Sequence, residues 1–78
     1  MHQAEALLWI ADLFQENPES LNVDTPRTAI RDWDSLGVLT LMAALDEKFA
    51  VVVSDDDTRA MQKVGDIIEL LRQKGKVL

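Results

Sequence analysis

Hydrophobic residues recur at helical spacing in three stretches of this chain. Within each stretch they occupy positions such as i, i+3, i+4 and i+7, which lie on one face of an α-helix. Asn17 and Pro18 end the first stretch, because the residue before a proline avoids the helical conformation. The pattern predicts helices over residues 3–16, 35–49 and 64–74. The residues expected on their buried faces are Ala4, Leu7, Leu8, Ala11 and Phe14, then Val38, Leu41, Met42, Leu45 and Phe49, then Val64, Ile67, Ile68 and Leu71.

A short helix is expected between the second and third of these stretches. Ser54 and Asp57 are spaced like a capping box, in which each side chain accepts a hydrogen bond from the other residue's backbone. Aspartates fill the first turn that follows, where the helix dipole favours negative charge. We therefore predict a helix over residues 55–61. The apolar residues 50–53 have no second strand to pair with, so we expect an extended, buried connection there.

Residues 17–33 lack a helical pattern and form a long connection. Loops of this length are usually functional or held by their own side chains. Leu21, Val23, Ile30 and Trp33 are the residues expected to anchor this one to the core. The predicted fold is all-α: a small four-helix bundle in one domain, residues 1–78, with a long loop between its first two helices and a short third helix.

The amino-acid composition argues against several classes of protein function. The 78 residues include no cysteine, which excludes disulfides and thiolate chemistry, and the single histidine, His2, lies at the chain end. The net charge of −6 argues against nucleic acid and anionic membrane surfaces, which attract clustered Lys and Arg. It favours partners with basic docking patches. We expect a monomer without membrane insertion or a resident metal, and by default a cytoplasmic location.

Asp34 and Ser35 are the residues with the clearest chemical potential. A serine that opens a helix after a long loop exposes its hydroxyl beside the unpaired N–H groups and the positive end of the helix dipole. Such a place suits a phosphodiester. The same pair is also ordinary capping chemistry, with Asp34 as the N-cap, and the dipeptide alone does not separate the two interpretations.

The order of elements around this pair resembles the acyl carrier protein family over nearly the whole chain. Three segments carry the resemblance: residues 33–37 (Trp-Asp-Ser-Leu-Gly), which are similar to the family's attachment motif, residues 45–49 (Leu-Asp-Glu-Lys-Phe), similar to the acidic end of its second helix, and residues 64–66 (Val-Gly-Asp), similar to the start of its fourth.

The resemblance implies a carrier that catalyses nothing itself. Ser35, flanked by Asp34 and Leu36, would be the attachment point of a 4′-phosphopantetheine arm. A phosphopantetheinyl transferase would attach the arm from coenzyme A with a magnesium ion. The arm's thiol would hold acyl groups as thioesters for fatty-acid, lipid or polyketide-type biosynthesis, and enzymes that load and process those groups would be the other partners.

The family's partners dock on its second helix, so the resemblance implies a docking face on this one. That face would comprise Leu36, Leu39, Thr40, Ala43, Asp46 and Glu47, extended by Asp55 and Asp56 of the short helix. An alternative interpretation of Leu39 is that its side chain packs into the core and takes no part in docking.

Four positions depart from the family's pattern. Gly37 and Thr40 stand where fatty-acid carriers have acidic residues soon after the serine, and Arg59 replaces an acidic residue of the short helix. Lys63 replaces the usual Ser or Thr cap of the last helix, whose start is expected to be weaker. These departures favour a specialised carrier.

Two other functions remain open on the sequence. A carrier of amino acids or peptides would use the same arm, although Arg31-Asp32-Trp33-Asp34 differs from the Gly-Gly-His/Asp-Ser type motif usual before a peptidyl carrier's serine. A small helical interaction module would need no modification, and Ser35 would only open its helix. A hydrolase is disfavoured because Ser35 has no plausible histidine base.

Overall fold

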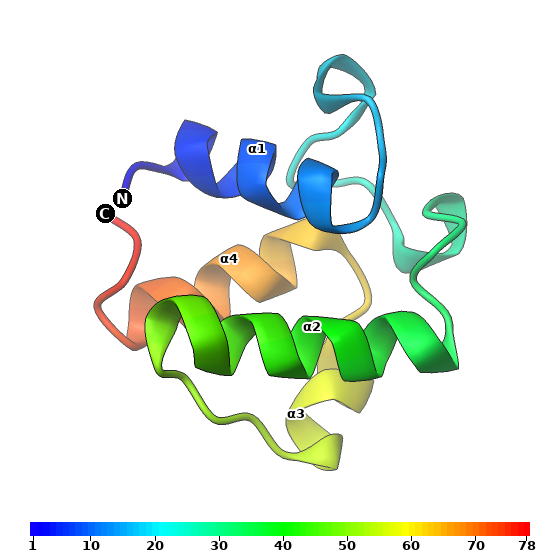
Figure 1. Ribbon diagram of the computed structural model, residues 1–78. Helices are drawn as coiled ribbons and strands as arrows, with labels where there is room; N and C mark the ends of the chain where they lie inside the picture. The colour runs from blue at the N-terminus through cyan, green and yellow to red at the C-terminus, as the bar shows by residue number, and fades with distance from the viewer.

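The computed structural model describes all 78 residues and confirms the predicted all-α fold. Figure 1 shows α1 lying above α4, α2 crossing in front, and the short α3 below. The only β-type pairing is an isolated bridge between Pro26 and Lys63. The elements in chain order are α1 (Gln3–Leu13), the 3₁₀ turns η1 (Pro18–Ser20) and η2 (Arg27–Ala29), α2 (Ser35–Phe49), α3 (Asp55–Ala60) and α4 (Val64–Gln73).

The predicted bounds of α2 are correct. Helices α3 and α4 each end one residue before the predicted end, a difference of the size by which methods of helix assignment disagree. The prediction for α1 was wrong by three residues, because the helix ends at Leu13. Gln15 takes a left-handed conformation (φ 56°), and the Glu16 N–H turns back to the Ala11 carbonyl at 2.8 Å. This arrangement closes a helix C-terminus and prevents its continuation.

The predicted buried face of α1 was also partly wrong. Ala4 is exposed and Leu8 is 56% exposed, whereas Ala6 and Ile10 are completely buried with Ala11 and Phe14. Apolar residues surround most of this short helix, so the spacing in the sequence is compatible with more than one buried face. The predicted faces of α2 and α4 are correct: Leu41 and Leu45, and then Val64, Ile67, Ile68 and Leu71, belong to the central core, which Val38, Met42 and Phe49 cover as partly buried residues.

The long loop is fixed at both of its ends and in the middle. Leu21, Ile30 and Trp33 are buried as predicted, and Val23 is partly buried. Backbone hydrogen bonds join the loop to the start of α4: Val64 N–H donates to the Thr25 carbonyl (3.0 Å) and Gly65 N–H to the Val23 carbonyl (2.8 Å). Lys63 occupies the N-cap position, and its side chain has no oxygen that could accept hydrogen bonds from the first N–H groups of α4. The loop carbonyls accept two of these hydrogen bonds instead.

Asp66 adds to this closure of the α4 N-terminus. Its Oδ2 accepts hydrogen bonds from the N–H groups of Gln62 (2.8 Å) and Lys63 (3.2 Å). The expectation of a weak start for this helix is therefore not supported, because the loop carbonyls and the Asp66 carboxylate replace the missing cap.

Candidate functional site

Ser35 lies at the first position of α2, where the long loop meets the helix. Its side chain is exposed, as is that of Leu36. Neither the Ser35 N–H nor the Leu36 N–H donates to an acceptor in the protein. The hydroxyl thus lies beside two free backbone donors at the positive end of a 15-residue helix, a setting that stabilises an anionic group.

Trp33 fixes the chain just before the serine. The indole is only 4% exposed and stacks on Phe14 of α1, with ring centroids 5.3 Å apart and planes 15° from parallel. The Arg27 guanidinium lies over the Trp33 ring, 5.6 Å from its centroid. Trp33 is therefore an anchor of the loop, and its burial limits the positions that Ser35 can take.

Asp34 closes the helix end, as predicted. Its Oδ1 accepts a hydrogen bond from the Gly37 N–H at 2.9 Å, which is the standard N-cap geometry. Gly37 is buried, and a Cβ there would overlap the backbone carbonyl oxygen of Asp32. The turn from Asp32 to Gly37 is consequently a tight unit in which the loop backbone packs directly on the first turn of α2.

The predicted docking residues of α2 form one continuous exposed face. Leu36 is 73% exposed and Leu39 is 61% exposed, so both apolar side chains lie mostly in solvent. Leu39 therefore does not pack into the core. The face also includes Thr40, Ala43, Asp46 and Glu47, all exposed.

The first turn of α3 forms an exposed acidic surface. Asp55 and Asp56 are exposed in the first turn of α3, and Asp57 and Ser54 form the predicted capping box, with hydrogen bonds of 3.0 and 3.1 Å. Arg59 makes an exposed ion pair with Asp56 at 3.6 Å, so one acidic group of this surface already has a cation beside it.

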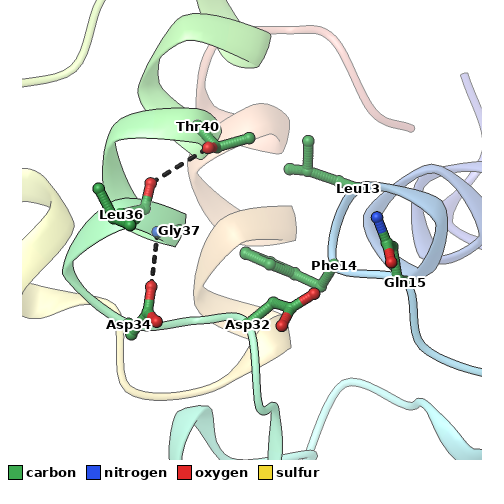
Figure 2. Close-up of a pocket in the computed structure, with 8 residues that line it drawn as sticks. All are labelled: Leu13, Phe14, Gln15, Asp32, Asp34, Leu36, Gly37 and Thr40. Carbon is green, nitrogen blue, oxygen red and sulfur yellow. Dashed lines mark hydrogen bonds between the residues drawn. The ribbon is translucent and has the colours of Figure 1, made fainter.

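A surface hollow of about 310 Å³ opens between the end of α1 and the start of α2, and both sequence neighbours of Ser35 line it (Figure 2). Leu13, Phe14 and Gln15 come from the α1 side, and Asp34, Leu36, Gly37 and Thr40 from the α2 side, with Asp32 between them. This α1–α2 hollow could not be predicted from the sequence. Asp32, Gln15 and Phe14 carry no motif of their own, and only the path of the loop brings them to α2.

No His, Asp or Glu side chains form a group of three that could hold a metal ion. None of the helices has the length and apolar composition needed to cross a bilayer.

Comparison with known proteins identifies relatives of the chain as a whole. No profile of a known protein family matches the chain. Curated relatives do: it is 34% identical over 65 residues to an acyl carrier protein of Chlamydia trachomatis serovar D, a match that covers 83% of this chain and 84% of the relative.

Two further relatives come from other bacteria. The chain is 35% identical over 63 residues to an acyl carrier protein of Solidesulfovibrio magneticus, covering 81% and 74% of the two chains. It is 28% identical over 71 residues to one of Renibacterium salmoninarum, covering 86% and 88%. The chain belongs to the acyl carrier protein family.

Proposed function

We propose that this protein carries acyl groups as thioesters on a 4′-phosphopantetheine arm attached to Ser35. The observation that carries the proposal is the position of this serine: it is exposed, first in α2, beside two unused N–H groups, and directly preceded by a buried tryptophan and an N-cap aspartate. Membership of the acyl carrier protein family supports the same assignment.

The residues around Ser35 suit a covalently attached phosphodiester. The Ser35 Oγ would form the new bond to phosphorus while coenzyme A loses adenosine 3′,5′-bisphosphate, and the hydroxyl proton would pass to the transferase. The free N–H groups of Ser35 and Leu36 and the helix dipole would stabilise the phosphodiester charge. Asp34 would act mainly through the helix start, because its Oδ1 already accepts the Gly37 N–H.

The arm would supply a thiol, which this chain otherwise lacks, and that thiol would hold the cargo as a thioester. The domain itself would present the cargo and raise its effective concentration at each partner enzyme. The exposed face of α2, with Asp55 and Asp56 beside it, would receive those enzymes. Its two exposed leucines and its reduced acidity near the serine favour a specialised biosynthetic pathway over housekeeping fatty-acid synthesis.

Intact mass spectrometry tests the attachment. After incubation with a promiscuous phosphopantetheinyl transferase, coenzyme A and Mg²⁺, we expect the mass to rise by roughly 340 Da, the mass of one covalent arm. Ser35→Ala should abolish the gain. Ser54→Ala is the matched control, because Ser54 also lies exposed at a helix start, and this variant should gain the full mass.

An unchanged mass with several transferases would overturn the proposal and favour an unmodified interaction module. If the arm is attached, mass spectrometry of the natively expressed protein then distinguishes the cargo. An acyl thioester supports the proposal, and an aminoacyl or peptidyl thioester would replace it with the related carrier function.

A further inference from the structure

We propose that Arg27 is a positioning residue for Ser35. Its guanidinium holds the Trp33 indole in the buried place from which the chain turns into α2, and the buried indole in turn fixes the serine that the transferase meets. The inference rests on the proposed attachment of the arm to Ser35, and it names a residue of the long loop that prepares this reaction.

The side chains of Arg27 and Trp33 both lack an ordinary polar partner. The two ion pairs of the protein lie within α3 and α4, and the only hydrogen bonds from a guanidinium belong to α4. The Trp33 Nε1–H is buried and donates to no acceptor. The Arg27 guanidinium lies over the indole ring, 5.6 Å from its centroid, where the negative face of the ring attracts a cation.

The unpartnered Nε1–H makes the buried position of Trp33 sensitive to each contact of the ring. A buried donor without an acceptor has lost its hydrogen bond to water, which favours positions of the indole that reach solvent. Stacking on Phe14 and the cation over the ring oppose this tendency. Phe14 is a core residue, whereas Arg27 is only partly buried. The Arg27 contact can therefore be removed without a cavity in the core.

The backbone around Arg27 is held independently of its side chain. The Arg27 N–H donates to the Gln62 carbonyl at 2.8 Å, and the Arg27 carbonyl accepts from the Ile30 N–H at 3.1 Å. The Ile30 carbonyl in turn accepts from the Trp33 N–H at 3.2 Å. A substitution of the arginine side chain leaves these hydrogen bonds available, so it tests the cation over the ring by itself.

A displaced Trp33 would leave Ser35 without the anchor that lies two residues before it. The transferase would then bind only the fraction of carrier molecules whose serine is in place, and the apparent affinity would fall by that fraction. Once bound, the serine would react at the ordinary rate. We therefore expect the KM for the carrier to rise and kcat to stay unchanged when Arg27 loses its charge.

Hydrogen exchange of the Trp33 indole N–H, followed by NMR on the unmodified protein, measures the displacement directly. This buried proton exchanges only when the indole reaches solvent. In Arg27→Gln its exchange rate should rise about two- to fivefold, the effect of one partly exposed cation–π contact. Arg27→Lys keeps a cation and should retain most of the protection. The KM of a phosphopantetheinyl transferase, at saturating coenzyme A and Mg²⁺, should follow the same order.

The exchange measurement contains a reference for global unfolding. The Ile68 amide lies in the middle of α4, and its side chain is 1% exposed. Its exchange rate should change little in Arg27→Gln. An equal rise at Ile68 and at the Trp33 indole would mean a general loss of stability and would overturn the positioning role.

Arg31→Gln is the matched control. Arg31 lies in the same loop and closer to Ser35 in the sequence, carries the same charge, and is exposed without an ion pair. It should leave indole exchange and KM unchanged. Equal effects of the Arg27 and Arg31 variants, unchanged indole exchange in Arg27→Gln, or faster exchange at an unchanged KM would each overturn the proposal.

The proposed attachment at Ser35 can fail separately. If the unaltered protein accepted no arm, the proposed function would be wrong, and Arg27 would have no transfer reaction to prepare. The exchange rates would still confirm or refute the hold of Arg27 on Trp33, because they require neither arm nor enzyme.

Discussion

The absence of a side chain at Gly37 shapes the immediate surroundings of Ser35. The Asp32 carbonyl occupies the space that a Cβ would need, and the Gly37 N–H is the group that Asp34 caps. The glycine thus lets the loop backbone and the helix approach closely on the side of α2 that faces α1. Any larger side chain at this position would collide with the loop backbone.

Replacing Gly37 with alanine gives a test with a clear sign. Helix propensity alone would make the alanine variant about 1 kcal/mol more stable. We expect the opposite, a loss of about 1–3 kcal/mol, because the added methyl group forces the Asp32 backbone to move. Urea unfolding measures the difference. Thr40→Ala, an exposed change on the same helix, is the control and should alter the free energy of unfolding little. A stabilised Gly37→Ala variant would show that the close packing is absent.

Individual residues differ in how far the sequence reveals them. Asp34 as N-cap, Ser54 with Asp57 as a capping box, and Trp33 as a loop anchor were all predicted, because each depends on residue type and local spacing. The contact of Gly37 with Asp32 could not be predicted, since it depends on where a 17-residue connection places its backbone.

At the scale of the elements, α2 is the helix whose two ends matter most. Its first residue is the candidate attachment point, and its end is formed by Ala50 in a left-handed conformation (φ 55°, ψ 35°). Alanine has no special tolerance for this region, and an L-residue with a Cβ pays about 1–2 kcal/mol there. The Ala50 N–H nevertheless bonds the Asp46 carbonyl at 2.9 Å, so the conformation is held by the helix end.

Ala50→Gly should therefore stabilise the protein. Relief of the left-handed strain is partly offset by the greater conformational entropy of glycine in the unfolded chain, which leaves a net gain of about 0.5–1 kcal/mol in the free energy of unfolding. Ala43→Gly is the matched control. Ala43 is exposed in the interior of the same helix, and the same substitution there should destabilise by about 0.5–1 kcal/mol. Thermal unfolding of both variants gives the comparison. Destabilisation by both changes would mean that Ala50 is not left-handed in solution.

Helices α1 and α4 differ in how well the spacing of hydrophobic residues predicts the buried face. The amphipathic pattern of α4 identified its buried face completely, because its apolar and charged residues are separated around the helix. In α1 apolar residues lie on most sides, and the packing of Ile10 and Phe14 decides which side is buried. The end of α1 depends on the left-handed Gln15, a residue type that gives no sign of such a turn.

At the scale of the whole molecule, the order and approximate length of all four helices followed from the sequence. The α1–α2 hollow did not, because it requires segments 17 residues or more apart to meet. The charge distribution lies between these cases: the net charge follows from the sequence, and the fold determines that the acidic groups in the first turn of α3 are exposed. Arg59 interrupts that surface through its ion pair with Asp56.

Arg59 should accordingly influence how fast the carrier associates with each partner enzyme. Exposed charges at the rim of an interface mainly set association rates and partner choice. For the arm-bearing protein, we expect a fatty-acid synthase ketosynthase at low salt to act on the Arg59→Glu variant with a kcat/KM higher by on the order of tenfold, the scale of electrostatic steering. Raising the ionic strength should remove most of this gain, because exposed charges are screened.

The control for this effect is Lys76→Glu, which makes the same change in net charge in the segment that follows α4. It should leave kcat/KM almost unchanged, because the enzyme would not contact that end of the protein. Equal gains for both variants would mean that net charge alone controls the encounter. If the unaltered protein already matched a housekeeping fatty-acid carrier in the same assay, Arg59 would not restrict partner choice and the inference of a specialised carrier would be wrong.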